Sequence, residues 1–329
     1  MNVTIKDIAK QANVSTSTVS RVLNGQDNFY ATKTAKKVHK AALKLGYRKN
    51  TNATELVTKK SNTIGVIMLA NKTNFANGIV DGIQDEALHN KLNVIIVHAG
   101  ENDPVLQKKA IQTVTERPVK GLLIVGIELA DENLQYLQQT GFPYLFISAE
   151  FSQDNVPFIT TDNFYSAYTA TQFLVDHGYR KIGLAGISDQ SFMGKRRIAG
   201  YLDALKHNKI NYEKNWLQPG NFSYQDGVVA IKKYQKNSNV DAVLCGSDYT
   251  ALGVLNEARE HGLEVPGDLG IMSMDGTELA QYISPEITSI EQSFFDMGVK
   301  GAKMLQKSFT NDFYQYIPFK IVEGNSTLK

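Results

Sequence analysis

Cysteine is almost absent from the 329-residue sequence, in which Cys245 stands alone. A single cysteine excludes an intrachain disulfide and is typical of proteins kept in a reducing compartment. We expect Cys245 to be a small buried residue. Histidine and cysteine at metal-ligand spacing are also missing, so we predict no metal site and no cofactor.

Long apolar runs are missing too. No stretch approaches the roughly 18–20 apolar residues that span a bilayer, and residues 1–7 lack the apolar core of a signal peptide. We therefore expect a cytoplasmic protein with no membrane partner. A Gly-x-Ser-x-Gly elbow, a His-Glu-x-x-His motif and a phosphate-binding glycine loop are absent as well, and we predict that the protein is not an enzyme.

Charge is distributed unevenly along the chain. Residues 1–60 hold ten Lys and two Arg against three acids, an excess of nine positive charges, although the net charge of the whole chain is only +2. The remainder therefore carries seven negative charges in excess. Basic side chains gain affinity for nucleic acids by releasing counterions from phosphates, so this asymmetry favours a polyanionic partner for the first 60 residues.

The stretch from Val14 to Asn24 has the pattern of a helix that lies on DNA. Ser15 is a suitable N-cap, and Val19, Val22 and Leu23 recur at helical spacing on one face. The opposite face carries side chains that bond phosphate oxygens or base edges in a major groove. These are Thr16, Ser17, Ser20, Arg21 and Asn24.

The residues around this stretch complete a three-helix unit. Thr4 and Asp7 form a capping box that opens a first helix, and Asn13 to Ser15 form the turn of a helix-turn-helix. A third helix is predicted over Lys33–Leu45, ended by Gly46. Small helical domains without DNA can show the same pattern, so the helices alone leave both interpretations open.

Beyond Asn62 the sequence alternates between apolar strands and amphipathic helices, which is typical of parallel α/β sheets. The alternation begins with a strand at residues 63–69, pauses after a segment at 158–161, and then starts again with a helix at 166–177. Two halves of similar size predict two doubly wound parallel-sheet subdomains. Ligands of such folds bind where the strands end and the halves face each other.

Ten short motifs along the chain together resemble one known family. They are Val3–Ala9, Val14–Asn24, Leu45–Tyr47, Gly121–Leu123, Asp162–Asn163, His177–Ile182, Arg197–Tyr201, Asp248–Gly253, Gly262–Asp268 and Thr288–Gln292. In this order they resemble the lactose-repressor/galactose-repressor family of bacterial transcription regulators. The resemblance covers essentially the whole chain and outweighs the DNA-free interpretation of the helices.

The resemblance implies an α/β protein with a helix-turn-helix head, a hinge helix and a core similar to periplasmic binding proteins. The expected domains are the head at 1–48, the hinge at 49–61, an N-subdomain at 62–162 and 293–316, and a C-subdomain at 163–292 and 317–329. A homodimer would bind a near-palindromic double-stranded DNA operator. No leucine-rich helix closes the sequence, so further pairing of dimers is not expected.

Carried over by position, the resemblance also implies the residues that contact DNA. Thr16, Ser17 and Arg21 would read base edges in the major groove, where a guanidinium can grip guanine. Leu56 would insert between base pairs from the minor groove. The phosphate contacts would come from Thr4, Ser15, Ser20 and Asn24. The hinge departs from the family pattern at Lys49, Thr54 and Glu55, from which we expect a hinge that folds less readily or an unusual operator.

In the core, the matching effector-binding positions are Phe75, Ser148, Arg197, Phe222, Ser247, Asp275 and Gln292. Arg197 and Asp275 could bracket vicinal hydroxyls of a sugar, while Phe222 or Phe75 offers an apolar face to its C–H groups. A salt bridge between Arg197 and Asp275 across the cleft is the alternative for this pair. A purine would use the same arginine and stacking, so the positions do not separate sugar from base.

Three regulatory functions follow as expectations. The first is a repressor of a carbohydrate-use operon controlled by a sugar-like small molecule, which could either induce or corepress. The second is a catabolite-control regulator with a phosphorylated carrier protein as corepressor, for which Lys303 and Lys307 supply basic residues on a late helix. The third is a purine-responsive repressor.

Overall fold

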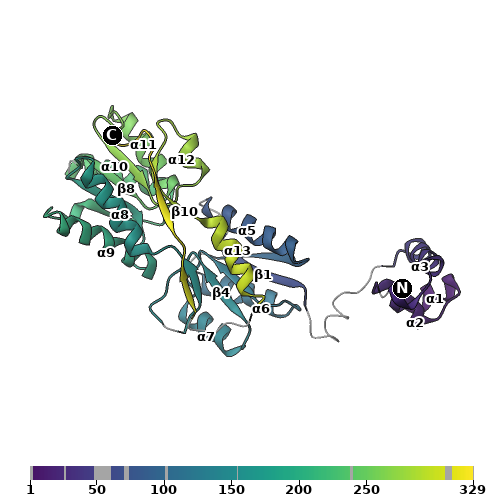
Figure 1. The fold of residues 1–329 in the computed structure, drawn as a ribbon. Helices are drawn as coiled ribbons and strands as arrows, with labels where there is room; N and C mark the ends of the chain where they lie inside the picture. The colour runs from purple at the N-terminus through teal and green to yellow at the C-terminus, as the bar shows by residue number, and fades with distance from the viewer. Residues whose placement is uncertain are drawn as a thin grey trace. The chain divides into compact units, whose positions relative to one another are not determined.

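The computed structural model describes residues 3–25, 27–47, 61–69, 74–100, 103–153, 155–237, 240–307 and 313–328. Two compact units make up the chain, Met1–Lys60 and Ser61–Lys329 (Figure 1). Within the described ranges, every helix is too short or too polar to cross a membrane. The hinge residues Lys49, Thr54, Glu55 and Leu56 lie outside the described residues, and the expected domain boundaries stay predictions.

The first unit is a head of three α-helices whose ends are set by local hydrogen bonds. They are α1 (Ile5–Ala12), α2 (Thr16–Leu23) and α3 (Thr32–Leu45), with the short 3-10 helix η1 (Asp27–Phe29) before α3. The Ser15 hydroxyl accepts the Thr18 N–H at 3.0 Å and so caps α2. Asn13 and Gly46 end α1 and α3 in the left-handed conformation. The predicted capping box, turn and caps are confirmed, and α3 begins one residue earlier than predicted.

The three helices bury one small apolar core. Ile8, Val19 and Val38 are completely buried at its centre, one from each helix. Ala9, Ala12, Val22, Ala41 and Ala42 surround them. Small alanine side chains let the helices approach closely. Because α2 buries Val19 and Val22, its opposite, polar face is turned outward as the sequence predicts.

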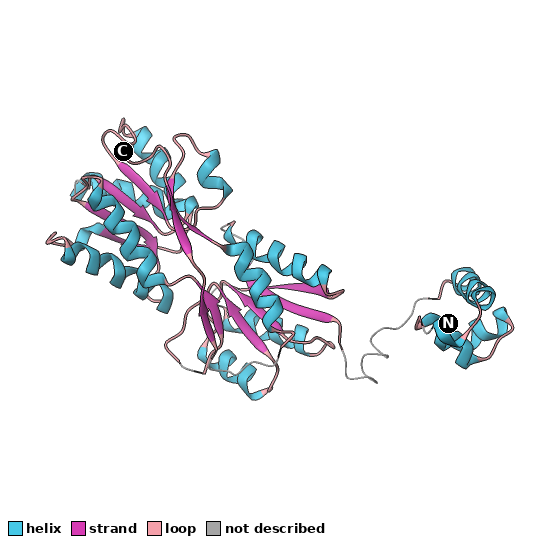
Figure 2. Ribbon diagram, viewed as in Figure 1, coloured by secondary structure: helices cyan, strands magenta, loops and turns pink. Residues whose placement is uncertain are grey.

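The second unit contains two six-stranded sheets flanked by helices (Figure 2). The first sheet has the order β11-β5-β4-β3-β1-β2, and the second has the order β12-β10-β9-β8-β6-β7. The strands of the first are β1 (Thr63–Leu69), β2 (Asn93–Ala99), β3 (Leu122–Val125), β4 (Tyr144–Ile147), β5 (Phe158–Thr160) and β11 (Tyr314–Tyr316). Those of the second are β6 (Ile182–Ile187), β7 (Leu217–Pro219), β8 (Ala242–Cys245), β9 (Gly270–Ser273), β10 (Thr288–Gln292) and β12 (Phe319–Val322).

Helices cover both faces of each sheet, which makes both subdomains doubly wound as predicted. One face of the first sheet packs on α5 (Phe75–His89) and α13 (Phe294–Met304), and the other packs on α6 (Pro104–Thr115) and α7 (Asp131–Gln139). The second sheet lies between α8 (Asn163–Asp176) with α9 (Phe192–His207) and α10 (Tyr224–Asn237) with α11 (Asp248–Glu260). The short α12 (Glu278–Tyr282) adds to the latter side. The strand β12 departs from the parallel pattern because it runs antiparallel to β10.

The chain passes from one sheet to the other after β5, after β10 and after β11. Each subdomain is therefore assembled from separate stretches of sequence. The carboxyl ends of β1, β3 and β4 in the first subdomain and of β6 and β7 in the second lead into loops that meet at the boundary. This boundary is where ligands of doubly wound sheets bind.

Candidate functional site

The exposed face of α2 is the candidate DNA-binding surface of the head. Thr16, Ser17, Arg21 and Asn24 are exposed there, and Ser20 is half-buried. The Asn24 amide donates to the Ser20 hydroxyl at 3.3 Å, and the Ser15 hydroxyl lies 2.7 Å from that of Ser17. These contacts gather neutral donors and acceptors with one guanidinium on a single surface, which is the chemistry of groove recognition.

Thr4 lies at the start of α1, where its hydroxyl is already used. It donates to the Asp7 carboxylate at 2.7 Å, and the Thr4 N–H donates to the same oxygen at 2.8 Å. These bonds from Thr4 lower the pKa of Asp7. A hydroxyl has one proton to donate, so a phosphate contact by the Thr4 side chain requires the capping box to open.

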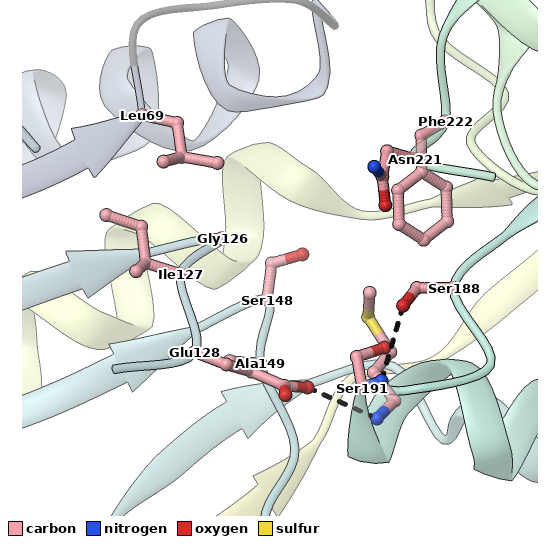
Figure 3. A pocket seen from close by; sticks show the side chains of 11 residues that line it. Leu69, Gly126, Ile127, Glu128, Ser148, Ala149, Ser188, Ser191, Asn221 and Phe222 are labelled. Atoms are coloured by element: carbon pink, nitrogen blue, oxygen red, sulfur yellow. Dashed lines mark hydrogen bonds between the residues drawn. The ribbon is translucent and has the colours of Figure 1, made fainter. Parts of the chain in front are cut away.

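The core unit has a cleft between its two subdomains, shown in Figure 3. The first subdomain contributes Leu69, Gly126, Ile127, Glu128, Ser148 and Ala149, and the second contributes Ser188, Ser191, Met193, Asn221 and Phe222. Hydroxyl, amide and aromatic groups thus face one space from both sides. Of the predicted effector residues, Ser148 and Phe222 line this cleft.

Two cleft residues hold a left-handed backbone that non-glycine residues rarely adopt. Ser148 has φ 56° and Phe222 has φ 61°. The Phe222 N–H donates to the Gly186 carbonyl at 2.9 Å, and its carbonyl accepts the Ser247 hydroxyl at 2.7 Å. Such strain persists where the surroundings over-determine it, and it clusters at ligand-binding sites. The backbone therefore fixes the Phe222 ring over the cleft.

Ser247 is buried and acts from behind the cleft. Besides its bond to Phe222, its hydroxyl accepts the Thr250 N–H at 3.0 Å and caps α11. The Asp226 carboxylate holds the same loop, residues 220–223, from the other side. It accepts the N–H groups of Asn221 at 2.8 Å and Ser223 at 2.9 Å. Ser247 and Asp226 thus shape the loop that presents Asn221 and Phe222.

Arg197 lies on α9 and is only 4% exposed. Its Nε donates to Asn163 Oδ1 at 2.8 Å, its Nη1 donates to the Gly246 carbonyl at 3.1 Å, and its Cζ lies 5.8 Å from the centre of the Phe222 ring. Burial lowers its pKa, against the attraction of Asp275. In this structure Arg197 supports the Phe222 ring rather than lining the cleft.

Asp275 follows β9 and is buried near Arg197. Its pKa is raised to about 8, because burial disfavours the charged form and Asp248 repels it, while Arg197 acts in the opposite direction. Among the ion pairs of the described residues, none joins Arg197 to Asp275. Both residues belong to the second subdomain, so the alternative of a salt bridge across the cleft is wrong.

Phe75 and Gln292 lie at a neighbouring hollow between α5, α12 and α13. The hollow measures about 620 Å³ and the cleft about 130 Å³, so size alone would favour the hollow. Both linings offer hydroxyls and aromatic rings, but the hollow carries four acids, Asp81, Glu278, Glu291 and Asp296, whereas the described lining of the cleft carries one, Glu128. Gln292 is also engaged, since its amide donates to the Met274 carbonyl at 2.7 Å. The seven predicted positions therefore do not share one cavity.

Glu128 connects the two subdomains at the cleft. Its carboxylate oxygens accept the backbone N–H groups of Phe192 and Met193, each at 3.4 Å, where α9 begins. Figure 3 shows the Glu128 side chain directed toward the second subdomain. Partial withdrawal from water raises the pKa of Glu128, and these two N–H groups oppose the rise. A negative charge at a helix N-terminus is stabilised by the helix dipole. Glu128 is not predictable from the sequence as a site residue, because it belongs to no motif and its partners are backbone groups.

Groups of three or more His, Cys, Asp or Glu side chains that could hold a metal ion are absent from the described part of the chain.

Three further cleft-lining residues were not predicted from the sequence, namely Ser188, Ser191 and Asn221. The N-cap role of Ser191, which accepts the Gly194 N–H at 3.0 Å, is the signal that could have pointed to it.

Comparisons with known proteins agree with this geometry. Residues 4–50 match the description "Bacterial regulatory proteins, lacI family", and residues 171–327 match "Periplasmic binding protein-like domain". Catabolite control protein A of Priestia megaterium is 31% identical over 309 residues, covering 93% of this chain and 92% of the relative.

Solved structures extend the similarity to the fold. A transcription regulator from Lactobacillus plantarum shares 41% identity and a TM-score of 0.73, covering 82% of this chain and 99% of that one. The Lac repressor dimer bound to operator and the anti-inducer ONPF shares 26% identity and a TM-score of 0.88, with complete coverage of both chains. This chain therefore belongs to the lacI family of bacterial regulatory proteins and is a DNA-binding transcription regulator.

Proposed function

We propose that this regulator represses a carbohydrate-use operon as a homodimer in the cytoplasm, under the control of an uncharged sugar bound in the cleft. The chemistry of the cleft carries the proposal. Its described lining offers the hydroxyls of Ser148, Ser188 and Ser191, the amide of Asn221 and the ring of Phe222. Sugars are held by such donors and acceptors around their hydroxyls and by an apolar face against their C–H groups.

The charge of the described lining favours a neutral ligand. Glu128 is the one ionisable side chain among the described lining residues. A phosphate or carboxylate on the ligand would be repelled by Glu128, which already occupies the N-terminus of α9 where an anion would otherwise bind. We therefore favour free sugars over sugar phosphates as the effector.

Ligand control of DNA binding requires that the sugar binds one arrangement of the subdomains more tightly than another. Residues from both subdomains line the cleft, so a bound ligand would change the free energy of closing it. The similar Lac repressor structure is a dimer on operator DNA with an anti-inducer, which supports a dimer that reads a near-palindromic site.

The proposal is tested by the melting temperature of the full chain in the presence of free sugars, sugar phosphates and nucleobases. A ligand that binds only the folded protein raises the melting temperature, and above Kd the rise grows with the logarithm of the ligand concentration. We expect a free sugar to give such a concentration-dependent rise. A rise with purines alone would favour the purine-responsive repressor, and a rise with phosphorylated metabolites alone would contradict an uncharged effector.

A catabolite-control regulator is the second candidate, favoured by the similarity to Catabolite control protein A. Two basic residues, Lys303 and Lys307, were expected to face the carrier protein. Lys303 already forms an ion pair within the chain, with its Nζ 3.5 Å from a Glu86 carboxylate oxygen. Lys307 is exposed. If a phosphorylated carrier protein is the corepressor, its addition will tighten operator binding by the full chain, and Lys307→Ala will weaken that effect.

A further inference from the structure

Phe29 lies on η1, directly after the candidate recognition helix, with its ring largely in water. The side chain is 63% exposed, which is unusual for a large apolar residue in a head this small. The ring centre lies 5.2 Å from Cζ of Arg21. Phe29 therefore contacts the residue that we expect to read base edges.

A contact with an aromatic ring leaves the N–H groups of the guanidinium available for hydrogen bonds. An arginine within about 6 Å of a ring centre is attracted by the negative face of the ring, and its plane can stack there. A carboxylate partner would instead occupy the N–H groups that must donate to a guanine. An aromatic partner thus restricts the side chain without competing for its hydrogen bonds.

The neighbouring Tyr30 shows that Phe29 is not needed to close the core. Tyr30 is half-buried and packs against the apolar core of the head, whereas Phe29 projects from it. Core packing alone would be satisfied by one of these two aromatic residues. The exposed ring is explained by its contact with Arg21.

We propose that Phe29 is a positioning residue for base recognition, which holds the Arg21 guanidinium ready to donate to a guanine in the operator. The proposal rests on Arg21 as a base-contacting residue. Ordering this long side chain before binding reduces the entropy that recognition must overcome. Phe29 would therefore increase both operator affinity and the preference for guanine at one position.

The test uses the full chain and an operator selected from a pool of random DNA sequences. Operator Kd is measured by fluorescence anisotropy for the wild type, Phe29→Leu, Phe29→Tyr, Arg21→Lys and the double variant Phe29→Leu/Arg21→Lys. Leu43→Ser is the matched control, since Leu43 on α3 is 83% exposed in the same head. Each protein is also measured on operators with single base-pair changes and at several salt concentrations.

We expect Phe29→Leu to weaken operator binding about two- to fivefold, with most of the loss at the base pair that Arg21→Lys also affects. Phe29→Tyr and Leu43→Ser should stay near the wild type. In the Arg21→Lys background Phe29→Leu should cost less than in the wild type, because an ammonium group has neither the plane that stacks on the ring nor the fork that the ring positions. The salt dependence of binding should not change, since no phosphate contact is removed.

Additive losses in the double variant would overturn the proposal, as would a Phe29→Leu loss that is equal at all base pairs. A Phe29→Leu protein that binds like the wild type would also overturn it. Arg21→Lys separately tests the base contact on which the proposal rests. If that variant weakens all sequences equally, Arg21 binds phosphate and the base contact itself is wrong.

Discussion

At the scale of single residues, Phe222 shows how the cleft is built. Its left-handed backbone costs about 1–3 kcal/mol for a non-glycine residue, and the chain keeps it with both backbone polar groups bonded. Glycine would adopt this conformation without cost but would provide no ring. The arrangement is explained by the position of the ring, between the cleft and the Arg197 guanidinium.

Replacing Phe222 by glycine or alanine separates strain from recognition. Both variants lose the ring, so the affinity for the sugar effector should fall at least about tenfold in each, as expected for a lost aromatic platform. Phe222→Gly should be more stable than Phe222→Ala by about 0.5–1 kcal/mol, because only glycine relieves the left-handed backbone. Urea unfolding and isothermal titration calorimetry measure the two effects. Equal stability of the two variants would show that φ at this position carries no strain.

Asp275 predicts a dependence of stability on pH. Its pKa is about 8 in the folded protein, above its ordinary value of 3.8, so the folded state holds a proton that the unfolded state has released between these values. Its contribution to stability is therefore fully present below about pH 4 and is lost as the pH rises through about 8. Asparagine does not titrate, so Asp275→Asn does not lose stability in this way. The free energy of unfolding of the variant should therefore rise relative to that of the wild type from pH 6 to pH 9.

The measurement is the urea midpoint of both proteins across that range. Asp203→Asn, at an exposed position on α9, is the control for the loss of one carboxylate elsewhere in the same subdomain. Below about pH 8 Asp275 is neutral, so Asp275→Asn removes no charge beside Arg197 over most of this range. A difference between Asp275→Asn and the wild type that stays constant from pH 6 to pH 9 would contradict the raised pKa.

The sequence predicted the residue types of the cleft better than their positions. The predicted residues Phe222 and Ser148 line the cleft. Arg197 and Ser247 are buried behind the loop that carries Phe222, and Gln292 donates to a backbone carbonyl. Sequence position shows which loop carries a residue, but burial and partners depend on how distant loops meet. The positive φ of Phe222 was not predictable because no glycine or asparagine marks it.

At the scale of elements, pairs of helices pack with their backbones in close approach at glycines. An added Cβ on Gly82 would lie 2.1 Å from the Phe295 carbonyl oxygen, so α5 and α13 approach too closely for any side chain there. The same distance separates a Cβ on Gly253 from the Tyr224 carbonyl oxygen, between α11 and α10. Backbone cannot move aside as a flexible side chain can, so these glycines set the separation of the helices.

Gly253→Ala should therefore destabilise the core unit by about 1–3 kcal/mol, the usual cost of overpacking, despite the better helix propensity of alanine. Gly267→Ala in the same subdomain is the matched control, because its added Cβ would meet Glu264 atoms only at 3.5 Å. The melting temperatures of both variants check the prediction. A Gly253→Ala protein as stable as Gly267→Ala would mean that α10 and α11 separate without cost.

Strands of fully buried apolar residues were predicted well, and three strands of half-buried or exposed residues were missed. The strand Tyr144–Ile147 has the predicted bounds, because buried apolar residues fill it from end to end. The strands β7, β11 and β12 were not predicted, since their residues are half-buried or exposed and form no buried apolar run. The helix α9 begins at Phe192, four residues before its predicted start, because the Ser191 cap lies beyond the clear helical pattern.

At the scale of the core unit, a few polar contacts connect the subdomains around the cleft. Glu128 reaches the start of α9, and Asn74 Nδ2 donates to Thr277 Oγ1 at 2.8 Å from the first subdomain to the second. Such contacts are made and broken as a unit when subdomains move, and each contributes only modestly. A ligand in the cleft would therefore shift the balance between arrangements of the core.

The most direct test of this account is the affinity of the full chain for its selected operator with and without the sugar that raises its melting temperature. We predict a change in operator Kd of at least about fivefold, the range of ordinary allosteric coupling. The change should saturate at the sugar concentration that saturates the cleft, and Phe222→Gly should need at least about tenfold more sugar for the same change. A sugar that saturates the cleft and leaves operator affinity unchanged would contradict the account.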